Sequence, residues 1–560
     1  MKKHLAVLVL AWSSASLWAG PAQTVRSRKS MVVSQVTLAS EIGSRALADG
    51  GSAVDAAVAT AFALAVTHPT AGNIGGGGFL LLRTKDGEAH AYDFREIAPA
   101  GAHPKMFLDE DGDYDADRHH NSHLAVGVPG TVAGLHLAWK EHGKLPWRRL
   151  VEPAIALARD GFVVTDGLAR NLQDYLPQFR RYPASLAQFS KNGTPYAAGD
   201  VFKQPDLART LERIAQDGPA GFYAGETAAL IEKEMRAEGG LITAQDLAGY
   251  QPKKRAPVRG SYRGHEVLSM PPPSSGGPTL VLMLNVLEGY DLKASGAGSA
   301  ANMHRMVEAM RRAYAERARH LGDPDFNQAI PLARLLSKDY AASLRRTIHE
   351  NRASKSSPAS FEWPAESDET THLSVVDEAR NAVSLTYTLE DAFGSKIVVP
   401  GGGFLLNNEM GDFNGGPGLT NAEGLIGTEP NLAVPGKRML SSMTPTIVVK
   451  DGQPLLVVGS LGGRTIINTV MQCIVNVVDF GLNVQEAIDA PRFHHQWLPD
   501  KIRYERIGIS PDTLALLRAK GHELQGISAQ GVAEGILLTK EGVLEGGFDR
   551  RAPDGGAAAR

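Results

Sequence analysis

Two neighbouring segments with alternating polar and apolar residues constrain this chain more than any other feature. The alternation runs from Thr370 to Asp377 and again from Asn381 to Glu390, and each run predicts a β-strand. Only a short connection around Ala379 separates them, so the pair predicts a tight hairpin. Its polar positions fall on one strand face, which places several hydroxyl groups side by side.

A symmetric register for this hairpin brings Thr370 opposite Thr388 and His372 opposite Thr386. Opposed residues have Cβ atoms about 4.5–5.5 Å apart. Just upstream, residues 353–369 are rich in serine, proline and acidic residues, which predicts an exposed, flexible linker. A threonine between a linker and a buried strand is where a self-cleaving N-terminal nucleophile is expected.

The hairpin sequence resembles the signature of the γ-glutamyltranspeptidase family. Members of that family cut a single precursor before a threonine and then use the threonine as nucleophile. Further blocks occur in the family's order at residues 71–79 (AGNIGGGGF), 93–96 (DFRE), 272–278 (PPSSGGP), 406–413 (LNNEMGDF), 437–445 (KRMLSSMTP) and 459–463 (GSLGG). The resemblance implies an α+β fold, a four-layer αββα sandwich of the N-terminal-nucleophile hydrolase type. Periodicity alone indicates only mixed helices and strands.

Cleavage between Glu369 and Thr370 is what the resemblance implies. It divides the chain into a leader (1–22), a large subunit (23–369) and a small catalytic subunit (370–560), which remain together as a heterodimer and share one core. Outside the hairpin, periodicity predicts helices at 52–66, 132–141, 227–237, 301–321 and 464–478, and strands at 79–83, 403–406, 446–449 and 455–458.

Composition narrows the partners and the location. The chain has 58 basic and 61 acidic residues and no basic stripe, so nucleic acid is not an expected partner. The N-terminus reads as a secretory signal, with an apolar stretch over Leu5–Trp12 and cleavage after Ala19 or Ala22. That stretch is shorter than the roughly 18 residues of a membrane span. We therefore expect a periplasmic or secreted protein with no stable membrane anchor.

The resemblance assigns the catalytic roles. Thr370 is the nucleophile, and cleavage frees its α-amino group, which titrates at about 7.7–8 and can serve as the base. Thr388 orients the Thr370 hydroxyl. Gly462 and Gly463, between a strand and a helix, supply backbone N–H groups to the oxyanion. Without the resemblance, ordinary strand threonines and a plain tight turn fit these residues equally well.

A γ-glutamyl substrate carries an α-carboxylate and an α-ammonium far from the scissile amide. Its recognition therefore needs a cation at one point and anions at another. The matching positions are Arg95, Ser441 and Ser442 for the carboxylate and Glu409, Asp412 and Glu390 for the ammonium, and Gly463 is also expected to contact the substrate. In an arbitrary protein, such charged residues are usually only solvated.

Four positions depart from the family pattern. Arg380 stands where glycine is usual in the hairpin turn, which bears on the turn type. Gly411 replaces the first acid of the usual Asp-Asp-Phe, and Leu461 replaces a frequent proline. The glycine-rich segment 414–428 resembles a lid, and Glu423 stands there where many bacterial relatives have tyrosine.

Other motifs do not indicate a cofactor or a metal. His119-His120 and His494-His495 lack metal-ligand spacing. The single cysteine, Cys473, lies in an apolar run and is expected to be buried and structural.

Three functions remain open. The first is a hydrolase and transferase acting on glutathione and other γ-glutamyl amides, with water, amino acids or dipeptides as acceptors. The second is a related acylase for glutaryl side chains of β-lactams, whose substrate lacks the ammonium. The third is an uncut periplasmic binding protein for glutamyl peptides, which predicts one band of about 60 kDa on a denaturing gel.

Overall fold

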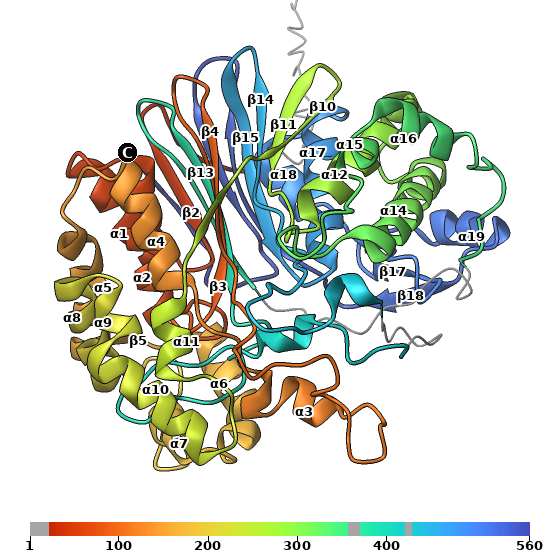
Figure 1. Cartoon of the computed structure of the whole chain (residues 1–560). Coiled ribbons are helices and arrows are strands. Elements are labelled where there is room, and N and C mark those ends of the chain that lie inside the picture. Colours follow the sequence, from red (N-terminus) through yellow and green to blue (C-terminus); the bar gives the residue numbers. More distant parts are fainter. Residues whose placement is uncertain (1–21, 357–369, 420–427) are drawn as a thin grey trace, which may run out of the picture.

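Two seven-stranded antiparallel sheets, packed face to face, form the centre of the molecule (Figure 1). The computed structural model describes residues 22–356, 370–419 and 428–560. The first sheet has the order β1 (Val25–Ser27), β20 (Leu544–Phe548), β19 (Val532–Leu538), β15 (Gln453–Leu461), β14 (Thr446–Lys450), β11 (His265–Ser269) and β10 (Val258–Tyr262). The second has the order β21 (Gly556–Ala559), β2 (Met31–Ser34), β12 (Thr371–Val376), β13 (Ala382–Thr388), β3 (Gly77–Arg83), β4 (Ala89–Phe94) and β9 (Lys253–Arg255).

Helices cover the outer face of each sheet (Figure 1). Against the second sheet lie α1 (Thr37–Ala48), α2 (Ala53–Thr67) and α4 (Thr131–His142), and α5 (Trp147–Asp160) packs on α2. Against the first lie α12 (Gly276–Leu287), α17 (Thr465–Val478) and α18 (Val484–Asp489), and α14 (Ala300–His320) packs on α12. The predicted α+β class and four-layer αββα sandwich are therefore confirmed.

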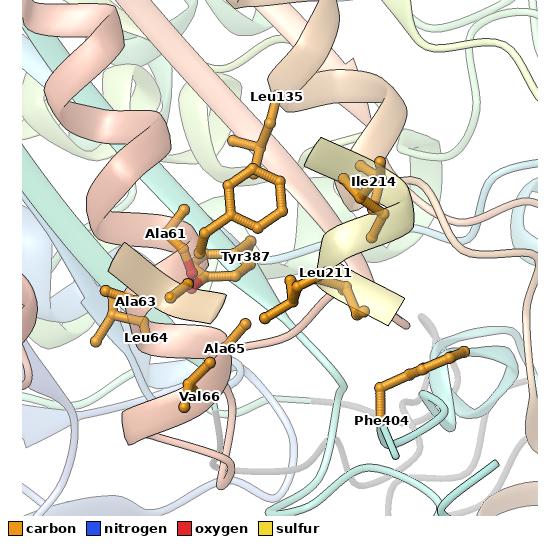
Figure 2. Packing of buried hydrophobic residues seen from close by; sticks show 14 of the residues in the cluster. Ala61, Ala63, Leu64, Ala65, Val66, Leu135, Leu211, Ile214, Tyr387 and Phe404 are labelled. Carbon is orange, nitrogen blue, oxygen red and sulfur yellow. The ribbon is translucent and has the colours of Figure 1, made fainter. Parts of the chain in front are cut away.

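The alanine-rich helix α2 shows how the sequence builds one of these layers. Ser52 and Asp55 form a reciprocal capping box at its start, and every residue of the helix is buried. Small side chains let the sheet approach closely, and the Tyr387 hydroxyl donates to the Ala61 carbonyl at 2.9 Å. Figure 2 shows this contact within the cluster that also holds Leu135. A helix that is apolar all round belongs in a core layer.

The hairpin β12–β13 lies in the middle of the second sheet. Its register pairs His372 with Thr386, as predicted. On one side β12 pairs with β2, and on the other β13 pairs with β3. Strands from before and after residue 370 are thus neighbours in one sheet, and the same holds in the first sheet, where β14 pairs with β11.

Most of the predicted elements are confirmed, including α4, α14, α17, α10 (Gly225–Ala237) and the β14–β15 hairpin. The predicted strand at 403–406 is wrong. Residue 405 makes only an isolated bridge with Val398, because Gly401 and Gly403 adopt positive φ and curl the backbone. The leader before residue 22, the linker 357–369 and Glu423 lie outside the described residues. No helix among the described ones is long and apolar enough to cross a bilayer.

Candidate active site

One cavity of about 260 Å³ collects nearly every residue that the sequence singled out. It lies between the start of β12, the end of β13 and the turn before α17. Its lining consists of Arg95, Thr370, Thr388, Glu390, Glu409, Asp412, Ser441, Ser442, Met443, Gly463 and Ile466. Of the predicted site residues only Gly462 is absent from this lining. Residues from five separate segments of the sequence therefore meet at one point.

Thr370 and Thr388 face each other at the open end of the hairpin. The Thr370 hydroxyl donates to the Thr388 hydroxyl at 3.4 Å, and both residues are buried. The backbone N–H of Glu390 donates to the Thr388 hydroxyl at 2.9 Å. At Glu390 the chain leaves the strand with a φ of 79°, a left-handed conformation that is uncommon outside glycine. This turn directs the Glu390 side chain into the cavity wall.

Gly462 and Gly463 form the turn between β15 and α17. Gly462 has a φ of 123°, and a Cβ there would lie 2.3 Å from the Thr465 hydroxyl oxygen, so the position requires glycine. Gly463 has a φ of 50° and lines the cavity directly. Backbone N–H groups beside a helix N-terminus stabilise negative charge. The turn is thus chemically suited to an oxyanion. Of the two glycines, only Gly463 lines the cavity.

Arg95 is the only arginine lining this cavity, and it is completely buried. Its guanidinium forms ion pairs with Glu409 and Asp412, and its Nη1 lies 3.6 Å from the Glu96 carboxylate. Burial alone would lower the pKa of Arg95, but the carboxylates of Glu409, Asp412 and Glu96 raise it above its ordinary value. A permanent cation therefore sits inside a cluster of acids.

Burial also raises the pKa values of the acids around this cation. It raises the pKa of Glu409 to about 8 and the pKa of Glu96 to about 7, although Arg95 opposes both shifts. Burial, reinforced by the neighbouring Asp391, Asp412 and Glu409, raises the pKa of Glu390 well above its ordinary value. Such shifted carboxyl groups in a cleft are typical of functional sites.

One of the two serines of the cavity, Ser442, is held by an arginine that sequence reasoning missed. Arg317 of α14 is buried, and its Nη2 donates to the Ser442 hydroxyl at 2.8 Å while its Nε donates to Ser275 at 2.6 Å. The Ser441 hydroxyl accepts the backbone N–H of Met443 at 3.1 Å. With an acceptor position filled, each hydroxyl can direct its hydrogen elsewhere.

A signal for Arg317 did exist in the sequence. It follows Met310 and Tyr314 at helical spacing, so it falls on the buried face of α14, where a charge needs a partner. Glu96 was likewise missed as an individual site residue, although its block was noted. Both of its carboxylate oxygens are buried, and neither has a hydrogen-bond partner among the described residues.

A second cluster has the residue types of a metal site. His304, Glu308 and His522 each place one possible ligand atom within 4.8 Å of the others. The carboxylate of Glu308 is already held by Arg311 at 3.3 Å and by Arg312 at 2.6 Å. Two cations on the only anionic ligand oppose a metal ion, so the cluster is a structural polar network.

The single cysteine, Cys473, is buried in α17, as predicted. Burial raises the pKa of its thiol to about 11, so it stays protonated and unreactive at neutral pH.

Comparisons with known proteins bear on the family of this chain. The family model described as gamma-glutamyltranspeptidase matches residues 39–559. The glutathione hydrolase proenzyme of Escherichia coli (strain K12) is 51% identical over 95% of this chain and 92% of its own length. A cephalosporin acylase from Bacillus halodurans superposes with a TM-score of 0.85 at 28% identity, over 99% of both chains. The gamma-glutamyltranspeptidase of Helicobacter pylori, 47% identical, superposes with a TM-score of 0.56 over 57% of this chain and 91% of its own. The chain belongs to the gamma-glutamyltranspeptidase family.

Proposed function

We propose that this chain is the precursor of a glutathione hydrolase and γ-glutamyltransferase whose nucleophile is Thr370. The observation that carries the proposal is the pairing inside the cavity. Arg95, Glu409 and Asp412 place buried charges of both signs side by side, in the same cavity as the Thr370 hydroxyl. A γ-glutamyl group presents a carboxylate and an ammonium on one carbon. The carboxylate is complementary to Arg95, and the ammonium is complementary to Glu409 and Asp412.

Substrate binding replaces one set of ion pairs by another. The α-carboxylate takes the guanidinium of Arg95, with Ser441 and Ser442 as hydroxyl donors. The α-ammonium takes the carboxylates of Glu409 and Asp412 that Arg95 releases, together with Glu390. Because the incoming zwitterion is neutral, the cluster keeps its net charge, which limits the desolvation penalty.

The reaction begins after scission frees the amine of Thr370. The Thr370 oxygen attacks the γ-carbonyl carbon and its proton passes to the α-amine, while Thr388 orients the hydroxyl. Gly462 and Gly463 stabilise the oxyanion, and the loss of one such donor costs about 2.7–4 kcal/mol in known enzymes. The C–N bond then breaks, the departing amine takes the proton, and a γ-glutamyl ester of Thr370 remains.

Water or an amine resolves the ester. The α-amine of Thr370 accepts a proton from the attacking molecule, the ester C–O bond breaks, and the threonine oxygen recovers the proton. Water gives glutamate, whereas an amino acid or dipeptide gives a new γ-glutamyl amide. The same residues serve both steps, since each reverses the proton movements of the other.

Processing divides the chain into the large subunit 23–369 and the small subunit 370–560, which stay together as a heterodimer. The pairing of strands from both segments in each sheet supports this, because neither segment forms a complete sheet alone. We further propose that residues 1–22 are a secretory leader and that the mature enzyme is periplasmic or secreted.

The test of processing is a denaturing gel with N-terminal sequencing. We expect two fragments, the smaller beginning Thr-Thr-His-Leu. Thr370→Ala should remain one uncut chain without turnover, whereas Thr370→Ser keeps a hydroxyl and should still cut itself. An uncut wild type that binds glutamyl peptides would instead support the binding protein.

The acylase alternative has the acylase-like superposition in its favour. Glutaryl and γ-glutamyl amides of one leaving group differ only by the ammonium, so they separate the two functions. We expect the γ-glutamyl amide to react faster by at least tenfold, because Glu409 and Asp412 have no partner on a glutaryl group. Equal rates would favour the acylase.

A further inference from the structure

The short helix α3 (Ala116–His120) brings a histidine to the acidic wall of the cavity. The Nδ1 atom of His120 lies 3.3 Å from a carboxylate oxygen of Glu390, and both side chains are largely buried. Glu390 does not take part in the ion pairs of Arg95, which join Glu409, Asp412 and Glu96. His120 is therefore a polar neighbour of the acid that stands nearest to Thr388 in the sequence.

The helix is attached firmly to the ammonium-binding segment. His119 stacks on Phe107 with ring centroids 4.1 Å apart and contacts the Met410 carbonyl at 3.2 Å. The carbonyl of His120 accepts the side-chain amide of Asn408 at 3.2 Å. Both contacts reach the loop around the 3-10 helix η3 (Glu409–Asp412), so His120 is held in a defined place relative to Glu409.

Gly411 provides the second observation. A Cβ at this residue would lie 2.4 Å from His120 Nδ1 and 2.6 Å from both carboxylate oxygens of Glu390. The family pattern has an acid at this position, and its side chain could not coexist with the pair as it stands. The absence of a side chain at residue 411 and the presence of His120 beside Glu390 thus depend on each other.

We propose that His120 is a positioning residue that orients Glu390 toward the substrate ammonium, in the space left by Gly411. This inference rests on the proposed function and deepens it. Glu390 becomes a third acceptor beside Glu409 and Asp412, and three acceptors match the three N–H bonds of an ammonium. The pair thereby contributes to the preference for γ-glutamyl over glutaryl groups.

The groups that face this pair are consistent with such a role. Asp391 raises the pKa of His120 and Lys396 lowers it, while burial has the largest effect and lowers it. Lys396 is engaged by Asp391 at 3.2 Å, which leaves His120 as the neighbour of Glu390 on the α3 side. Tyr114 and His119 also lie near the His120–Glu390 pair. The Tyr114 hydroxyl and the His119 Nδ1 atom form a hydrogen bond with each other at 2.8 Å.

The experiment measures KM and kcat of the processed enzyme with a γ-glutamyl amide and its glutaryl analogue. For His120→Ala we expect KM for the γ-glutamyl amide to rise about tenfold with kcat within twofold, since Glu390 loses the side chain that orients it toward the ammonium. KM for the glutaryl amide should not change. His120→Asn places an amide nitrogen near the Nδ1 position and should restore KM to within about threefold.

His123→Gln is the matched control. His123 forms a similar pair with Glu234 at 3.1 Å, three residues along the chain, but it does not line the cavity. This variant should leave KM for both amides unchanged.

Gly411→Ala tests the same pair without replacing either of its two residues. The nearest atoms are ends of side chains, so the new methyl group displaces His120 and Glu390 but no backbone. We expect KM for the γ-glutamyl amide to rise about tenfold, and the Gly411→Ala/His120→Ala double variant to match either single variant, because both act on one interaction.

Additive effects, an unchanged KM, or an equal loss for both amides would overturn the assignment to His120. A wild type that turns over no γ-glutamyl amide would instead overturn the proposed function. The two failures are therefore distinguishable.

Discussion

The β12–β13 hairpin is held differently at its two ends. At the turn, Asp377 accepts the Asn381 N–H at 2.9 Å, its side-chain amide at 2.7 Å and the Ala53 N–H at 3.2 Å. This carboxylate therefore joins the turn to the first residue of α2. At the open end, the hydroxyls of Thr370 and Thr388 meet at a longer 3.4 Å.

Backbone conformation follows the same contrast. Just past the open end, Glu390, Phe393 and Lys396 all have positive φ, and each such non-glycine residue costs about 1–3 kcal/mol. The turn contains one such residue, Arg380, where a tight turn requires it. The comparison indicates that the turn stabilises the fold, while the strained end presents the reacting groups. Strain persists only where the surrounding structure is firm enough to hold it.

The largest expected effect lies at the open end. Thr388→Val keeps the volume of the side chain but removes the hydroxyl that orients Thr370 and accepts the Glu390 N–H. We expect kcat to fall about 100-fold, equivalent to about 2.7 kcal/mol. The free energy of unfolding should fall by about 1 kcal/mol, because the Glu390 N–H loses its acceptor. Thr386→Val is the matched control, since its hydroxyl contacts His372 at 2.8 Å outside the cavity. If both variants lost the same activity, the contrast between strand and site would disappear.

The turn should show the reverse behaviour. Asp377→Ala leaves buried N–H groups of Ala53 and Asn381 without their acceptor, so we expect the free energy of unfolding to drop by about 2–3 kcal/mol. Steady-state kcat and KM of the folded fraction should stay within twofold. Urea denaturation of the processed enzyme measures the first quantity. A change in KM without a loss of stability would contradict the division of roles.

The third prediction concerns pH at the open end. Burial raises the pKa of Glu409 to about 8, so this group is mainly protonated below pH 8 and becomes a carboxylate as the pH rises through that value. Only the carboxylate pairs with an ammonium. We therefore expect KM for a γ-glutamyl amide to fall about tenfold between pH 6.5 and 8, and KM for the glutaryl amide to stay flat. Glu409→Gln should have a higher KM with no such slope.

The hairpin and most residues of the cavity were predictable from the sequence. The period-two alternation fixes the pairing of His372 with Thr386, because a slip of one residue would turn every side chain to the other face. The blocks that resemble the family contain nearly every residue of the cavity lining. The strand predicted at 403–406 was wrong because glycines there have positive φ, and a hydropathy pattern carries no information on backbone conformation.

The parts that were missed depend on tertiary packing. Arg317 reaches Ser442 from α14, and His120 reaches Glu390 from α3, so each pair joins segments that are far apart in the sequence. Neither residue has a local pattern that points to its partner. The sequence does show that residue 411 is glycine. Only the structure shows that His120 and Glu390 fill the space that a side chain at this position would need.

The smallest effect tests the turn itself. The Arg380 guanidinium donates to the carbonyls of Arg28, Lys29 and Gly542 at 3.0–3.1 Å, and its backbone has a φ of 69°. Arg380→Ala removes the donors and keeps the strain, so the free energy of unfolding should fall by about 1 kcal/mol.

Arg380→Gly removes the strain as well, and we expect it to be about 1 kcal/mol more stable than the alanine variant and close to wild type. Urea midpoints of the two variants give this difference directly, and neither should alter KM. Equal midpoints would mean that the left-handed backbone at residue 380 costs nothing. The strain at Glu390, inferred from the same kind of φ value, would then lose its energetic support.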